Sequence, residues 1–108
     1  MTIRIVTVGI DRSLTSRVAL DWVIERARHT PTQVGLVTVV PVPPPGLRTL
    51  GTVRTFYEEN VREAADFAKQ AAIFKTVSSM LTHGDPSERL MEASSFTDIL
   101  VVGTDRHP

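Results

Sequence analysis

The sequence contains no cysteine among its 108 residues. Without thiols the chain can have no disulfide framework, no thiolate metal ligand and no cysteine nucleophile, and its composition suits a reducing cytoplasm. An excess of one charge is also missing, because 12 Lys and Arg residues balance 12 Asp and Glu residues. This balance leaves no large basic field, so we expect no nucleic-acid partner.

Long hydrophobic runs are missing as well. No apolar segment reaches the roughly 18 residues that a membrane-spanning helix needs. The first residues lead directly into an apolar strand pattern and lack the regions of a signal peptide. We therefore expect one soluble cytoplasmic domain over residues 1–108, without a membrane partner.

Short apolar segments rich in Val and Ile predict four strands, at residues 3–10, 34–40, 74–82 and 98–103. The first has apolar residues on both faces, as a central strand between two helical layers does. The third is more polar, which is typical of an edge strand. A stiff proline-rich segment, residues 41–46, follows the second strand and is interpreted as a surface loop.

Amphipathic patterns predict a helix between each pair of strands. The first follows Ser13, whose hydroxyl can cap its free amides, and the second covers about residues 53–72. Trp22 falls at helical spacing in the first helix and is interpreted as a packing residue. The apolar stripes of these two helices are Leu20, Val23, Ile24 and Ala27, and Tyr57, Val61, Ala64, Ala65, Ala68 and Ala72.

The third helix has a strong start signal, with Asp85 as N-cap, Pro86 at the first helical position and Glu88 placed for a capping box. Its buried side is expected to consist of Leu90, Met91 and Ala93. The whole order is then β-α-β-α-β-α-β. This alternation predicts an α/β fold with a doubly wound parallel sheet.

Several kinds of catalytic or metal chemistry are not favoured. The three histidines are far apart in the sequence, at His29, His83 and His107, which argues against a metal site. No Gly-x-Ser-x-Gly elbow is present. Residues 46–52 have the glycine spacing of a P-loop but lack its Lys-Ser/Thr. We expect no enzymatic activity, although slow ATP hydrolysis stays open.

Three motifs follow one another across nearly the whole chain. They are Val8-Gly9-Ile10-Asp11 with Ala19-Leu20-Asp21-Trp22 downstream, Gly84-Asp85-Pro86 before a helix, and Asp98-Ile99-Leu100-Val101-Val102-Gly103-Thr104. In this order and spacing, together with the second strand, they resemble the universal stress protein family.

The resemblance implies a flavodoxin-like, adenine nucleotide alpha hydrolase-like sheet with strand order 3-2-1-4-5. In this chain the order would be 3-2-1-4, with the fifth strand missing. The resemblance also implies a homodimer and, in one branch of the family, ATP or AMP bound as part of a stress-response sensor.

The resemblance further implies a site at the switch point of the sheet. Asp11 would accept hydrogen bonds from the ribose, and Val39 would offer backbone groups to the adenine. The phosphates would approach Val102 and Gly103. By position, the candidate nucleotide-binding residues are Gly9, Ile10, Asp11, Arg12, Val39, Val102, Gly103, Thr104 and Arg106.

Two arginines depart from the pattern of the nucleotide-binding branch. Arg106 occupies the place of the second glycine of its phosphate loop, and Arg12 stands where many members have glycine. A guanidinium binds phosphate but does not reproduce a backbone nest. The alternative is therefore a member that binds no nucleotide and acts as a dimerisation or protein-interaction module.

The fourth predicted strand would be an apolar sheet edge. Three explanations of the short end stay open: a fragment, a naturally truncated member, or a partner chain that covers this edge.

Overall fold

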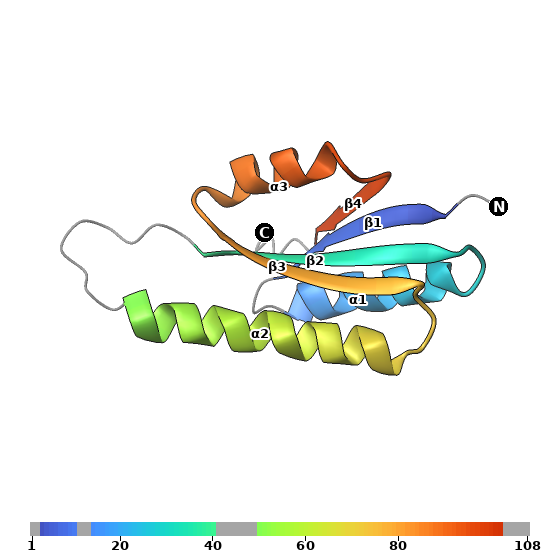
Figure 1. Ribbon diagram of the computed structural model, residues 1–108, viewed down its shortest axis with the longest axis horizontal. Helices are drawn as coiled ribbons and strands as arrows, with labels where there is room; N and C mark the ends of the chain where they lie inside the picture. The colour runs from blue at the N-terminus through green and yellow to red at the C-terminus, as the bar shows by residue number, and fades with distance from the viewer. Residues whose placement is uncertain (1–2, 11–13, 41–49, 103–108) are drawn as a thin grey trace, which may run out of the picture.

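The computed structural model describes residues 3–10, 14–40 and 50–102. The elements are β1 (Arg4–Gly9), α1 (Leu14–Ala27), β2 (Thr32–Val40), α2 (Leu50–Gln70), β3 (Thr76–His83), α3 (Pro86–Ser94) and β4 (Ile99–Val102). All strand pairs are parallel, in the order β3-β2-β1-β4. The predicted α/β class and strand order are confirmed. Figure 1 shows α1 and α2 on one face of the sheet and α3 on the other.

The hydrophobic core lies between the sheet and the α1–α2 layer. Val8 and Leu36 of the two central strands have no exposed surface. The predicted stripe of α1 is confirmed, because all four of its residues are buried. Burying a Leu or Val side chain is worth about 1.5–3 kcal/mol, so this face supplies most of the hydrophobic stabilisation.

The opposite face of the sheet is more open. β1 was expected to be buried on both faces, and this is wrong for its first half, where Ile5 is 42% exposed. The reason is that β4 begins only opposite Val6 and that α3 is short. This face therefore has a groove of about 390 Å³, whose lining residues include Ile5, Met80 and Phe96.

The second helix ends before the predicted boundary. α2 ends at Gln70, and Ala72 is exposed and has a φ of 54°. A residue in the left-handed region terminates an α-helix. The prediction that Ala72 belongs to the inner stripe is therefore wrong, whereas Val61, Ala65 and Ala68 are buried as expected.

The third helix begins where its sequence predicts, with Asp85 at the N-cap position and Pro86 in the first turn. The capping box is wrong, because no side chain makes a cap hydrogen bond there. Met91 was expected to be buried and is 72% exposed. It follows half-buried Leu90 by one residue, about 100° further around the helix, and so points away from the sheet.

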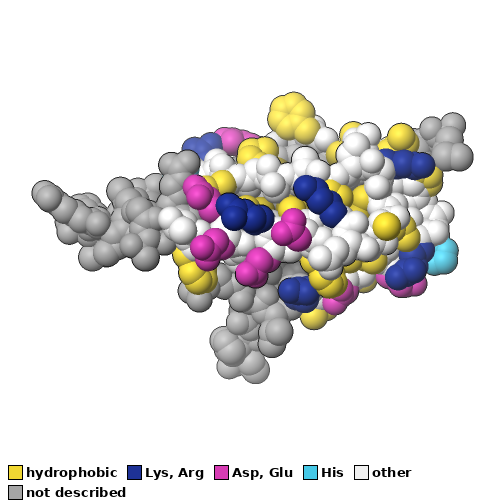
Figure 2. Space-filling view, turned by 60° about the horizontal axis from the view of Figure 1, so that its bottom comes forward, with side chains coloured by type: hydrophobic (Ala, Val, Ile, Leu, Met, Phe, Trp, Pro, Cys, Tyr) yellow, Lys and Arg dark blue, Asp and Glu magenta, His cyan; other side chains and the backbone are white. Residues whose placement is uncertain are grey.

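Charges of both signs are mixed over the helical layer, as Figure 2 shows. Two arginines pair with glutamates three residues away. Arg28, the residue after α1, pairs with Glu25 at 3.2 Å, and Arg89 pairs with Glu92 within α3 at 2.9 Å. Among the described residues, no helix combines the length and the apolarity needed to cross a membrane.

Candidate functional site

The candidate site lies at the rim where the parallel strands β1 and β4 end. Gly9 is opposite Val37 of β2 on one side and opposite Val102 of β4 on the other. The strand order reverses at β1, with β2 on one side and β4 on the other, and α1 and α3 lie on opposite faces. Open α/β sheets bind ligands at such a switch point, outside the carboxyl ends of the strands.

Two hydrogen bonds hold Ile10, the residue that directly follows β1. The Ile10 N–H donates to the Val37 carbonyl at 2.8 Å. The Thr38 hydroxyl, which has no exposed surface, donates to the Ile10 carbonyl at 2.9 Å. Both the N–H and the carbonyl group of Ile10 are therefore hydrogen-bonded to β2.

The glycine at the end of β1 lies close to α3. A Cβ added at Gly9 would lie 3.3 Å from Leu90 Cδ2 and 3.7 Å from Val102 Cγ2. The absence of a side chain thus lets α3 approach the sheet closely at this rim. Leu90 and Val102 fill the space above Gly9 on the α3 face.

Val39 lies one strand away, near the end of β2. Val37 directs its carbonyl to β1, and Val40 directs its carbonyl to Gly84 beyond β3, at 3.1 Å. Because the peptide groups of a parallel strand alternate in direction, those of Val39 face the β1 side, beyond Ile10. This is the position in which backbone groups could contact a planar base.

Arg89 of α3 links this helix to the end of β3 by a hydrogen bond. Its Nε donates to the His83 carbonyl at 3.0 Å, and its Nη1 donates to both carboxylate oxygens of Glu92 at 2.9 Å. Gly84, which follows His83, has a φ of +133°, a conformation that favours glycine. Arg89 is therefore a structural cation here, with its charge already paired.

The structure thus brings together four of the sequence-predicted site residues, Gly9, Ile10, Val39 and Val102. The other five, Asp11, Arg12, Gly103, Thr104 and Arg106, lie outside the described residues, as do the Ser13 cap and the loop 41–46. No group of three or more His, Asp or Glu side chains suitable for a metal ion occurs in the described part of the chain.

Sequence reasoning missed Thr38 and Leu90 as residues that shape this rim. Thr38 is the one polar side chain in the run Leu36-Val37-Thr38-Val39-Val40. A hydroxyl in such a run needs a hydrogen-bond partner, and this was the available signal. Nothing in the sequence indicates that Leu90 packs against Gly9.

The sequence profile of the universal stress protein family matches residues 2–108. The chain belongs to this family. No curated protein sequence matches it significantly.

Solved structures share the fold. A universal stress protein family member from Burkholderia pseudomallei is 27% identical, with a TM-score of 0.72 over 94% of this chain and 81% of that chain. A universal stress protein in complex with cAMP is 24% identical, with a TM-score of 0.70 over 92% and 75%. A family protein from Arabidopsis thaliana with AMP bound is 16% identical, with a TM-score of 0.68 over 94% and 76%.

We predict that Thr38→Val destabilises the protein by about 1–3 kcal/mol, because the isosteric change leaves the buried Ile10 carbonyl without its side-chain donor. The measurement is urea denaturation followed by circular dichroism. Thr76→Val, the same change at an exposed position of β3, is the control and should stay within about 0.5 kcal/mol. Equal stability of the two variants would contradict the role of Thr38.

Proposed function

We propose that this universal stress protein domain binds an adenine nucleotide, ATP or AMP, at the carboxyl rim between β1 and β4. The observation that carries the proposal is the parallel register of Gly9 with Val102. It places the ends of two strands on one rim at the point where the strand order reverses, which is where nucleotides bind in this architecture. Two proteins of the same fold carry cAMP and AMP, which supports the proposal.

Each part of the nucleotide has a proposed partner. Asp11, two residues after Gly9 in the sequence, would accept hydrogen bonds from the ribose hydroxyls. The peptide groups of Val39 would bind the adenine edge. Gly103 and Thr104, which follow Val102, would meet the phosphates, assisted by the charge of Arg12 and Arg106.

The proposed role is that of a sensor rather than an enzyme. Binding of a nucleotide stabilises the folded state by mass action, and no turnover is needed for this effect. Slow hydrolysis of ATP is compatible with the role. The cytoplasmic location expected from the sequence stays a prediction.

A second function, self-association, is favoured by the outer edge of β4. Among the described residues β4 pairs with β1 alone, and Val102 at its end is 43% exposed. Thr7 of β1 lies opposite Leu100, and its peptide groups face β4 because those of Ile10 face β2. In a parallel pair the groups of Thr7 bond to the Ile99 carbonyl and the Val101 N–H, so the N–H groups of Leu100 and Val102 point away from β1. An unpaired edge of this kind is a template for another strand, and we propose a second copy of the chain as the partner.

For nucleotide binding, we expect calorimetric titration with ATP or AMP to give saturable heat. Asp11→Ala should weaken binding about tenfold or more, because hydrogen bonds to a charged group contribute about 1.5–3 kcal/mol. Asp21→Ala, at an exposed position of α1, is the matched control and should bind like the wild type. Absence of heat at millimolar nucleotide, or equal affinities of the two variants, would contradict the proposal.

For self-association, we expect sedimentation equilibrium to show a dimer and amide hydrogen exchange to locate its interface. The Leu100 N–H, which faces away from β1, should be protected in the dimer and should exchange faster on dilution. The Val101 N–H, which faces β1, should stay protected at both concentrations. A monomer at all concentrations, or rapid exchange at Leu100 in the dimer, would rule out pairing through β4.

A further inference from the structure

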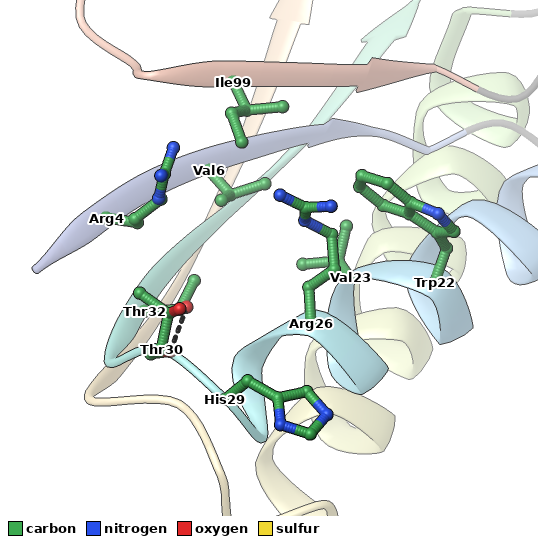
Figure 3. A pocket seen from close by; sticks show the side chains of 9 residues that line it. All are labelled: Arg4, Val6, Trp22, Val23, Arg26, His29, Thr30, Thr32 and Ile99. Atoms are coloured by element: carbon green, nitrogen blue, oxygen red, sulfur yellow. Dashed lines mark hydrogen bonds between the residues drawn. The ribbon is translucent and has the colours of Figure 1, made fainter.

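A pocket of about 240 Å³ lies at the rim of the sheet opposite to the proposed nucleotide site. It opens where β1, β2 and β4 begin and where α1 ends, as Figure 3 shows. Arg4, Val6, Trp22, Arg26 and Ile99 are among its lining residues. The proposed nucleotide site uses none of them.

One wall of the pocket is an indole with a guanidinium beside it. Trp22 was interpreted from the sequence as a packing residue, but it is 47% exposed. The guanidinium carbon of Arg26 lies 4.7 Å from the centre of the Trp22 ring. This cation–π contact holds the Arg26 head at the pocket while leaving its N–H groups free to donate.

A second guanidinium enters from the other side. Arg4, at the start of β1, and Arg26, on α1, both extend into the pocket in Figure 3. Neither forms an ion pair with a carboxylate among the described residues, whereas Arg28 and Arg89 do. The carboxylate of Asp98, next to the lining residue Ile99, accepts a hydrogen bond from the Ile5 N–H at 2.8 Å.

The floor between the two arginines is apolar. Val6 and Val23 are buried, and Ile99 is half-buried. The hydroxyl of Thr32 is already used, because it donates to the Thr30 carbonyl at 2.7 Å. The pocket therefore offers positive charge that no described carboxylate pairs with, above an apolar surface and beside an aromatic face.

We propose that this pocket binds a small organic anion with one aromatic ring, such as an aryl phosphate or an aryl carboxylate. The acid group would lie between Arg4 and Arg26, each of which can donate two parallel hydrogen bonds to it. The ring would lie on Val6 and Ile99 beside the Trp22 indole. A volume of about 240 Å³ is below the range of sites for drug-sized ligands, which suits a single ring.

Tryptophan fluorescence is a specific probe of this pocket, because Trp22 is the one tryptophan of the sequence. The experiment titrates the full chain with phenyl phosphate and with benzoate at constant ionic strength, and follows tryptophan fluorescence. We expect a saturable change with both anions. Benzyl alcohol, which has the ring without the charge, should give none.

Variants assign the signal to the two arginines. Arg26→Gln and Arg4→Gln should each raise the dissociation constant about tenfold, the loss expected for a charge-assisted hydrogen bond. Arg28→Gln removes the same charge from a side chain that pairs with Glu25 outside the pocket, and it should leave the dissociation constant unchanged. Thermal unfolding of each variant verifies that it is folded.

Three outcomes would overturn the proposal. One is a fluorescence change that rises linearly without saturation, as in collisional quenching. Another is an equal response to benzyl alcohol. The third is a loss of affinity in Arg28→Gln as large as in the two pocket variants, because this would indicate a general effect of charge.

Discussion

The structure depends on β1 having a parallel hydrogen-bonded neighbour on each side. On the β4 side the backbone of Ile5 is bound reciprocally, because its N–H donates to the Asp98 carboxylate and its carbonyl accepts from the Asp98 N–H. The Thr97 hydroxyl donates to the same carbonyl at 2.7 Å. These contacts join residues more than 90 positions apart at the amino end of β1, and they set the register that brings Gly9 opposite Val102 at the carboxyl end.

Because all four strands run in one direction, the sheet has two chemically different rims. The carboxyl rim carries the ends of β1 and β4, where we propose that a nucleotide binds. The amino rim carries Arg4 and Arg26 around an apolar floor. The two anionic ligands that we propose would therefore bind at opposite rims of one sheet, one to backbone groups and one to guanidinium groups.

The elements and their order could be predicted from the sequence, because apolar strands and the stripe of α1 are local patterns that the core confirms. What could not be predicted depends on neighbours distant in the sequence. Met91 fits a buried pattern, but α3 presents only one narrow side to the sheet. Trp22 is 47% exposed although it falls at helical spacing, and the left-handed Ala72 has no sequence signal. For the site, the sequence led to Gly9 but not to the hydrogen bond that ties Thr38 to the neighbouring Ile10.

Parallel pairing of β1 with β4 is tested most directly by nuclear Overhauser effects between these two strands in isotopically labelled protein. The parallel register predicts contacts of Thr7 with Leu100 and of Gly9 with Val102, together with contacts of Thr7 with Gly35 on the other side of β1. Contacts in the reverse order, with Gly9 near Ile99, would show antiparallel pairing. They would contradict a site shared by β1 and β4, because the ends of the two strands would then lie on opposite rims.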